Sequence, residues 1–183
     1  MITCRVLGRR ESRLYEYFLK ERNLDTRSMY FGYAAPDEQI VRLVDEVVAH
    51  PDKHRIIVAE NDQLEIVGTI HIASLSDCEV EFGVMVSEAY RGLGISSQMM
   101  DYAMTYCQNR GLNHVYMHCL GHNKPIIHLV EKYGLEITKE YGDADARVTL
   151  PPINFFTLGR EAYLRHQNTL QQNIRSFRRM MPV

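Results

Sequence analysis

Hydrophobic periodicity divides most of the chain into short strands and amphipathic helices. Apolar residues at helical spacing predict helices over residues 11–20, 40–48, 96–110 and 124–132. Short β-branched or alternating runs bounded by turn residues predict strands over residues 2–7, 55–59, 65–73, 78–86, 114–120, 135–141 and 146–150. Residues 23–32 are polar and then aromatic, and they show no clear period.

This order of elements predicts a mixed α/β domain over residues 1–150. The strands between residues 55 and 86 are typical of an antiparallel meander, and those between 135 and 150 of a closing hairpin. Pro151-Pro152 is the one boundary signal, so we expect residues 151–183 to form a helical extension packed on or next to the domain. That helix ends in the basic cluster Arg175, Arg178 and Arg179, a pattern typical of a solvated helix terminus.

Bulk composition is that of an ordinary soluble protein. A chain of 183 residues is long enough for one domain with an appendage, and its net charge of −2 gives no basic surface for nucleic acid or an anionic membrane. No segment approaches the roughly 20 apolar residues that span a bilayer, and the first residues lack the apolar core of a signal peptide. The four cysteines form no CxxC pair, so reduced thiols in the cytoplasm are expected.

The most informative segment is the glycine-rich turn from Arg91 to Ser97, which joins a predicted strand to a predicted helix. A helix N-terminus presents unpaired N–H groups and the positive end of the helix dipole, so we expect a phosphate or pyrophosphate here. Gly92 and Gly94 let such an anion approach the backbone closely, and the alternative is that they only permit a sharp bend. A dinucleotide fingerprint would need a glycine in place of Ser97, and a P-loop would need Gly-Lys-Ser/Thr, so neither motif fits.

The sequence Arg91-Gly92-Leu93-Gly94-Ile95-Ser96 resembles the Arg/Gln-x-x-Gly-x-Gly/Ala signature of the GNAT superfamily of acetyl-CoA-dependent N-acetyltransferases. Ser96 stands where that family usually has Gly or Ala, but serine is small and can still donate its hydroxyl to a phosphate. The resemblance extends back over Glu81 to Val86 and forward from Asn123 to Leu135. With the matching order of strands and helices, the resemblance covers about the middle half of the chain, from Arg55 to Leu150, and its three motifs come in the right order.

The resemblance implies a mostly antiparallel sheet in which the strands 81–86 and 115–120 splay apart and leave a slot for acetyl-CoA, the co-substrate. Backbone groups near Val84 and Val86 would pair with the pantetheine arm as an added strand would, and an N–H near Val86 would polarise the thioester carbonyl. The residues expected to bind acetyl-CoA are Val84, Met85, Val86, Arg91, Gly92, Leu93, Gly94, Ile95, Ser96, Ser97 and Asn123. Asn123 would hold the pantetheine or cap the helix that follows it.

Direct acetyl transfer needs a base that takes a proton from R–NH3+. Glu81 holds the position at which many GNAT enzymes carry the general base, often acting through water. Glu79 and Glu81 share one face of their strand, so the alternative is a pair of solvated surface carboxylates.

The proton donor to the departing thiolate is harder to assign. The family's tyrosine at this position falls on Val130, which has no proton to donate. Tyr133 is the candidate substitute, although three residues rotate it about 60° from that direction on a helix, and a core role is the alternative. His118 and Cys119 are further candidates, and the enzyme needs no dedicated acid if the thiolate leaves unaided.

The acceptor pocket is implied to lie between residues 25–32, 38–48 and 141–150. Its candidate residues are aromatic or acidic, and core packing or solvated turns are the alternative roles: Tyr30, Phe31, Tyr33, Asp25, Glu140, Asp143 and Asp145. The histidines and cysteine between His114 and His122 match no zinc spacing, so no metal is expected.

Two functions follow. The leading one is an N-acetyltransferase that acts on a primary amine of a small molecule, peptide or protein. The alternative is an acyl-CoA-binding regulatory or interaction domain without catalysis, which the missing tyrosine favours. The C-terminal helix would cover an apolar patch or form a dimer contact.

Overall fold

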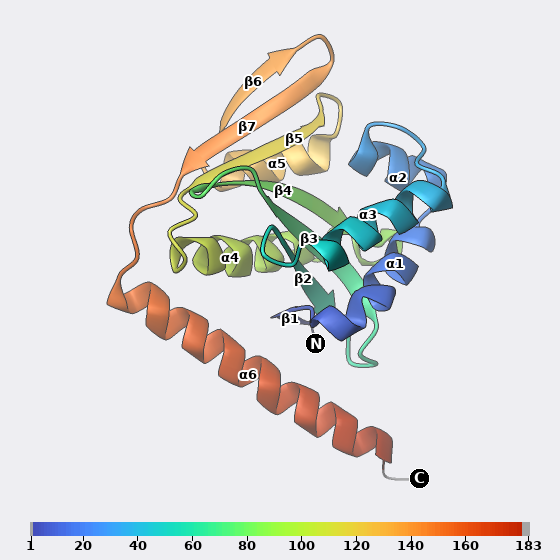
Figure 1. Ribbon diagram of the computed structural model, residues 1–183, viewed down its shortest axis with the longest axis vertical. Helices are drawn as coiled ribbons and strands as arrows, with labels where there is room; N and C mark the ends of the chain where they lie inside the picture. Colours follow the sequence, from blue (N-terminus) through green and yellow to red (C-terminus); the bar gives the residue numbers. More distant parts are fainter. Residues whose placement is uncertain (1, 181–183) are drawn as a thin grey trace.

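The computed structural model describes residues 2–180, and within the last helix it describes side chains up to residue 170 and at 173. Seven strands form one sheet in the order β1-β2-β3-β4-β5-β7-β6 (Figure 1). The strands are β1 (Thr3–Val6), β2 (His54–Glu60), β3 (Ile66–Ser74), β4 (Glu79–Val86), β5 (His114–Leu120), β6 (Glu136–Glu140) and β7 (Asp143–Thr149). All neighbours are antiparallel except β4 and β5. This confirms the mixed α/β fold, the meander from β2 to β4 and the closing hairpin.

Helices cover both faces of the sheet and build two cores (Figure 1). The helices are α1 (Ser12–Lys20), α2 (Leu24–Phe31), α3 (Asp37–Ala49), α4 (Ile95–Gln108), α5 (Lys124–Lys132) and α6 (Phe155–Met180), with short 3-10 turns at Arg9–Glu11 and Glu88–Tyr90. Helices α4 and α5 bury Met99, Ala103 and Leu129 with one face of the sheet. Helices α1 and α3 bury Tyr15, Leu19 and Ile40 with the other. Side chains along β4 alternate between the two faces of the sheet, so Phe82 packs into the first core and Met85 into the second.

Strands β4 and β5 pair over only three residues and then separate. The parallel register runs from Glu79 opposite His114 to Glu81 opposite Tyr116 and goes no further. Beyond Glu81, β4 keeps β3 on one side, as far as Val86 opposite Gly68. The edge of β4 that faces β5 therefore has no paired strand from residue 82 to 86, the splay that the resemblance implied.

Helix α2 was not predicted, because its buried face is polar. Thr26 and Arg27 are its buried residues, so the hydrophobic period that announces a helix is missing. Arg27 is satisfied by the Ala35 carbonyl at 3.0 Å and by Asp37 at 2.7 Å. Both ends of α2 carry ordinary caps: the Asn23 side chain accepts from the Thr26 N–H at 2.8 Å, and Gly32 ends the helix at φ 79°.

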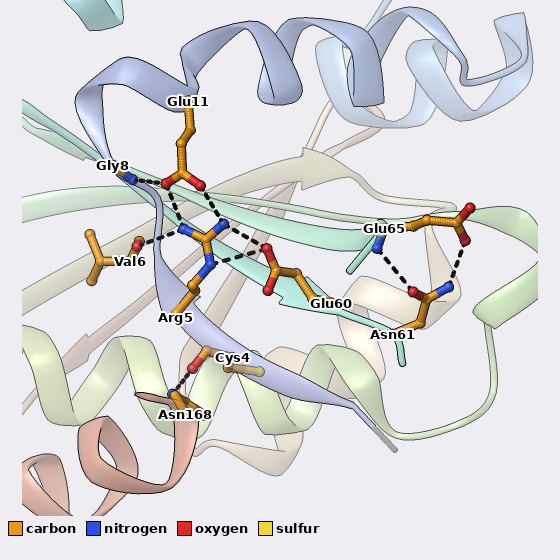
Figure 2. A network of polar contacts seen from close by, with 9 residues as sticks. All are labelled: Cys4, Arg5, Val6, Gly8, Glu11, Glu60, Asn61, Glu65 and Asn168. Atoms are coloured by element: carbon orange, nitrogen blue, oxygen red, sulfur yellow. Dashed lines mark hydrogen bonds and ion pairs between the residues drawn. The ribbon is translucent and has the colours of Figure 1, made fainter. Parts of the chain in front are cut away.

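A buried ion-pair network fixes β1 to β2 and to the start of α1 (Figure 2). The Arg5 guanidinium donates to the Glu60 carboxylate at 2.6 Å and to both oxygens of Glu11 at 2.7 Å. Glu11 also accepts from the Gly8 N–H at 2.7 Å, which closes the turn between β1 and α1. Burial alone would raise the pKa of Glu11, but the hydrogen bonds from Arg5 and Gly8 outweigh it and hold that pKa below its usual range.

Helix α6 follows the predicted boundary at Pro151-Pro152 and runs along α4 and β1 (Figure 1). Glu161 is buried there and accepts from Asn109 at 2.7 Å and Arg110 at 3.0 Å. The Asn168 side chain donates to the Cys4 carbonyl (Figure 2). The side chains of the basic cluster Arg175, Arg178 and Arg179 lie outside those described, and the dimer contact expected of this helix stays a prediction.

Strand β7 begins at Asp143, three residues before the predicted start. The aspartates on either side of Ala144 favour a turn in the sequence. In the structure, however, Ala144 and Ala146 are buried opposite Cys119 and Met117 of β5. The extra residues pair with the end of β5 and bring Asp145 to the sheet face described below.

Candidate active site

A cleft of about 530 Å³ lies where β4 and β5 separate. Its floor is the free edge of β4, its two ends are the glycine-rich turn and the start of α5, and α2 forms the wall. The lining residues are Thr26, Met29, Tyr30, Val84, Met85, Val86, Tyr90, Arg91, Gly92, Ser96, His122, Asn123, Lys124, Pro125 and Ile126. Six of these were predicted to bind acetyl-CoA at the turn and on β4: Val84, Met85, Val86, Arg91, Gly92 and Ser96. Asn123, also predicted, lines the opposite end.

The glycine-rich turn has the geometry of an anion site. Gly92 and Gly94 have φ values of 76° and 75°, the left-handed region that favours glycine, and a β-carbon on either would meet nothing within 4 Å. Within the described chain, the N–H groups of residues 92–97 donate to no protein acceptor, and the first helical bond here is from Gln98 to the Gly94 carbonyl at 3.0 Å. Six donors at the positive end of a 14-residue helix thus remain for a ligand. These residues fit a pyrophosphate.

Polar contacts tie the α2 wall to the turn and to α5. Thr26 donates its hydroxyl to Glu88 at 2.7 Å and accepts from the Arg91 guanidinium at 2.6 Å. At the other end of α2, the Asn123 side chain donates to the Met29 carbonyl at 3.3 Å, and it accepts no capping bond from its own helix. The α2 wall is therefore anchored at both ends of the cleft.

A second, smaller hollow of about 280 Å³ lies further back along β4. Its lining includes Tyr30 and Phe31 from α2, Glu81 and Gly83 from β4, His71 from β3, and His118 and Cys119 from β5. The first hollow is termed the donor cleft and the second the acceptor cleft. The two clefts share Met29 and Tyr30, so a molecule in one borders a molecule in the other.

Cross-strand register gathers polar side chains on the sheet face that floors the acceptor cleft. Glu81 lies opposite Tyr116, and Asp145 of β7 lies opposite His118. Asp145 accepts from the Tyr116 hydroxyl at 2.7 Å and is 2.9 Å from His118 Nδ1. Those hydrogen bonds, from His118 first, lower the pKa of Asp145. Burial, the bond to Asp145 and the charge of Glu81 raise the pKa of Tyr116 to about 12.

His71 is the buried base of this face. It lies opposite Gly83 and 3.0 Å from His54 Nδ1, and burial lowers its pKa to about 4, so the ring stays neutral near pH 7. Sequence periodicity gave no signal for His71, because the residue lies in a strand whose residues 67–72 are buried on both faces.

Tyr133, predicted as a proton donor, does not line the donor cleft or the acceptor cleft. Its hydroxyl bonds the Ser97 carbonyl at 2.7 Å and Asp101 at 2.9 Å, under the start of α4. Burial and the bond to Asp101 raise its pKa, so the proton is held between two protein acceptors. This geometry favours the alternative role, in which Tyr133 anchors the end of α5 beneath the glycine-rich turn. Val130, at the family's tyrosine position, is fully buried.

The remaining residues predicted to bind acetyl-CoA lie around the glycine-rich turn and do not line the donor cleft. Ile95 is buried in the core, Leu93 is exposed, and the Ser97 hydroxyl accepts from Lys132 at 2.9 Å. The sequence did not indicate that Thr26 and Met29 of α2, or the cation Lys124, would line the donor cleft. The caps at Asn23 and Gly32 were the available signal for α2.

Comparison with known proteins agrees with this geometry. Residues 12–135 match the acetyltransferase (GNAT) family, and the chain belongs to that family. It is 27% identical over 90 residues to YwnH of Bacillus subtilis strain 168, provisionally named a phosphinothricin acetyltransferase. That match covers 46% of this chain and 55% of the relative, so the chain spans about half the length of the curated protein it matches.

Solved structures share the fold. A GNAT-family acetyltransferase from Streptococcus pneumoniae superposes with a TM-score of 0.67 at 15% identity, covering 82% of this chain and all of that one. The spermidine N-acetyltransferase of Vibrio cholerae in complex with CoA and spermine superposes with a TM-score of 0.63 at 19% identity. The match covers 80% of this chain and 92% of that one. Among the described residues, no group of three or more His, Cys, Asp or Glu side chains is placed to hold a metal, and no helix is long and apolar enough to cross a membrane.

Proposed function

We propose that the protein is an acetyl-CoA-dependent N-acetyltransferase that transfers acetyl directly to a primary amine. The observation that carries the proposal is that the donor and acceptor clefts meet along one strand, β4. Residues 84–86 border the donor side, and Glu81 borders the acceptor side two residues before Gly83. A thioester held along β4 would thus end beside the one carboxylate in the acceptor lining.

Each part of the chain has a role in this reaction. The free N–H groups of residues 92–97 bind the pyrophosphate, with Arg91 and Lys124 adding positive charge, and the edge of β4 orients the pantetheine arm. Bound acetyl-CoA supplies the acetyl thioester. Glu81 takes a proton from the attacking nitrogen, directly or through one water, and an N–H of β4 stabilises the charge that develops on the carbonyl oxygen.

The charge of the acceptor cleft favours a cationic amine. Glu81 borders the cleft, and Asp145 adds a second carboxylate on the same sheet face through His118 and Tyr116. Both attract an ammonium group and repel acids. The Vibrio cholerae protein of similar fold is named for spermidine, an aliphatic polyamine. We propose an aliphatic primary amine here, as a small molecule or as a side chain of a peptide, and the free thiols of the four cysteines agree with action in the cytoplasm.

An acceptor panel tests the proposal. Purified protein with acetyl-CoA is incubated with polyamines, amino acids, lysine peptides and phosphinothricin, and products are identified by mass spectrometry. We expect a mass increase of one acetyl group on at least one aliphatic amine, with stoichiometric release of CoA thiol. CoA binding without acetylation of any amine in the panel would favour the alternative, a binding domain without catalysis. Absence of CoA binding would contradict both.

A further inference from the structure

The junction between the donor and acceptor clefts is the place where a proton donor to the leaving sulfur must stand. The linings of the two clefts have two residues in common, Met29 and Tyr30. A methionine thioether has no proton to give, whereas a phenol does. Tyr30 is therefore the proton donor that borders both clefts.

The backbone of β4 makes room for this tyrosine. A β-carbon on Gly83 would lie 2.6 Å from the Tyr30 hydroxyl oxygen, closer than real side chains approach, and 3.0 Å from Cε2 and Cζ of the ring, which is a tight contact. The hydroxyl end of Tyr30 thus packs against the strand at the point where the lining changes from acceptor cleft to donor cleft. Because Gly83 is followed at once by Val84, the phenol sits one residue from the segment proposed to hold the pantetheine arm.

Neighbouring groups keep the Tyr30 hydroxyl protonated and do not commit its hydrogen to another acceptor. Its hydroxyl oxygen is 3.4 Å from the hydroxyl of the fully buried Tyr15, which can act as the donor in that pair. Burial, opposed by the bond to Tyr15 and aided by the charge of Glu81, raises the pKa of Tyr30 to about 12. Tyr30 is consequently a neutral phenol at pH 7 whose own hydrogen can point into the clefts.

The other candidates are worse placed. Val130 is buried and has no donor, and the Tyr133 hydroxyl is committed to Ser97 and Asp101. His118 and Cys119 border the acceptor cleft alone, on β5, and Asp145 holds His118.

We propose that Tyr30 is the general acid of this enzyme and delivers its hydroxyl proton to the sulfur of the departing CoA. The proposal rests on the acetyltransferase function proposed above. The ammonium group first loses one proton to solvent water through Glu81, so the nitrogen attacks as a neutral amine. As this nitrogen forms its bond to the carbonyl carbon, Glu81 accepts its second proton. The carbon–sulfur bond breaks, its electron pair goes to sulfur, and sulfur takes the proton of Tyr30. Water in the acceptor cleft then returns the proton from Glu81 to the Tyr30 phenolate, so the products are the amide and free CoA thiol and both residues are restored.

Tyr30→Phe tests this role, because phenylalanine keeps the ring over Gly83 and removes only the hydroxyl. We expect kcat to fall about 10²-fold, the low end for general acid–base catalysis because a thiolate is a fair leaving group, with CoA affinity unchanged. Tyr106→Phe is the matched control, since it removes one buried tyrosine hydroxyl that bonds Arg55 outside both clefts, and its kcat should stay within about 3-fold of wild type. A Tyr30→Phe enzyme within about 3-fold of wild type would overturn the proposal for Tyr30 and leave the acetyltransferase function standing. A wild-type protein that binds CoA and acetylates no amine would overturn both.

Replacing Tyr30 with a fluorinated tyrosine separates an acid from a merely structural hydroxyl. The more acidic phenol keeps its shape and its hydrogen bond to Tyr15, but it ionises at lower pH. The groups that face it are Tyr15 from α1, Glu81 from β4, His71 from β3 and His118 and Cys119 from β5. Those that share the donor-cleft lining with it are Tyr90, Arg91, His122 and Lys124. These groups are the same in both enzymes, so only a role for the Tyr30 proton predicts that kcat will fall on the alkaline side at a lower pH than in wild type. Superimposable pH profiles of kcat would contradict the assignment.

Discussion

Glu81→Gln is expected to lower kcat by about 10²–10⁴-fold while leaving the affinity for CoA unchanged. Glutamine keeps the size of the side chain but cannot accept a proton from the amine. Glu81 borders the acceptor cleft and lies three residues before the β4 segment that borders the donor cleft, so the loss should fall on the chemical step. Steady-state kinetics with the best amine of the panel, and calorimetric titration with CoA, measure the two quantities.

The chain offers a close control in Glu79. It lies two residues away on the same face of β4, but it borders a different surface hollow, with Cys78 and His114. Glu79→Gln should therefore retain wild-type kcat within about 2-fold. The deficit of Glu81→Gln should also shrink as the pH rises toward the pKa of the amine, about 10 for an alkyl ammonium, because the acceptor then arrives neutral. Equal activities of the two glutamine variants would refute Glu81 as the base.

Arg5→Ala is expected to destabilise the folded protein by about 3 kcal/mol, the lower end of the range for breaking a buried ion pair. The Glu60 side chain is 3% exposed and the Arg5 side chain 16%, so removal of the cation leaves a buried carboxylate without its guanidinium (Figure 2). The same change frees Glu11 and the turn at Gly8, which hold β1 to α1. The free energy of unfolding from urea titrations at pH 7 measures the effect.

Arg13→Ala serves as the exposed counterpart. Its side chain is 77% exposed and pairs with Glu16 within one helix, so its removal should cost below about 1 kcal/mol. The difference between wild type and Arg5→Ala should also depend on pH. Because Arg5 holds the pKa of Glu11 below its ordinary 4.5, that part of the stabilisation is fully present above pH 4.5 and is lost as the pH falls through the lowered value. A cost for Arg5→Ala no larger than that for Arg13→Ala would contradict the network's role.

The donor side of the site could be predicted because it is built from backbone. Gly92, Gly94 and the helix start after them specify a conformation directly, since positive φ values and unpaired N–H groups follow from residue type and position. The splay of β4 from β5 came only with the resemblance, because a missing strand pairing leaves no mark in a hydrophobic pattern.

The acceptor side was predicted less well because it depends on tertiary contacts. Helix α2 buries Thr26 and Arg27 through hydrogen bonds, so it has no apolar stripe to detect. The approach of Asp145 to His118 depends on the register of β5 with β7, which local sequence does not determine. Tyr133 followed from the family's tyrosine position on α5 and from helical spacing, whereas the junction of the clefts is reached by Tyr30 from a distant helix.

Hydrogen–deuterium exchange with added CoA tests the central claim most directly. The account predicts that CoA slows exchange in the peptides that contain the free N–H groups of residues 92–97 and in those at the end of β4. It predicts no change at the turn between β6 and β7, which lies outside the donor cleft. Protection that appears elsewhere while residues 92–97 exchange as before, or the absence of any CoA-dependent protection, would contradict the assignment of this cleft to the acetyl donor.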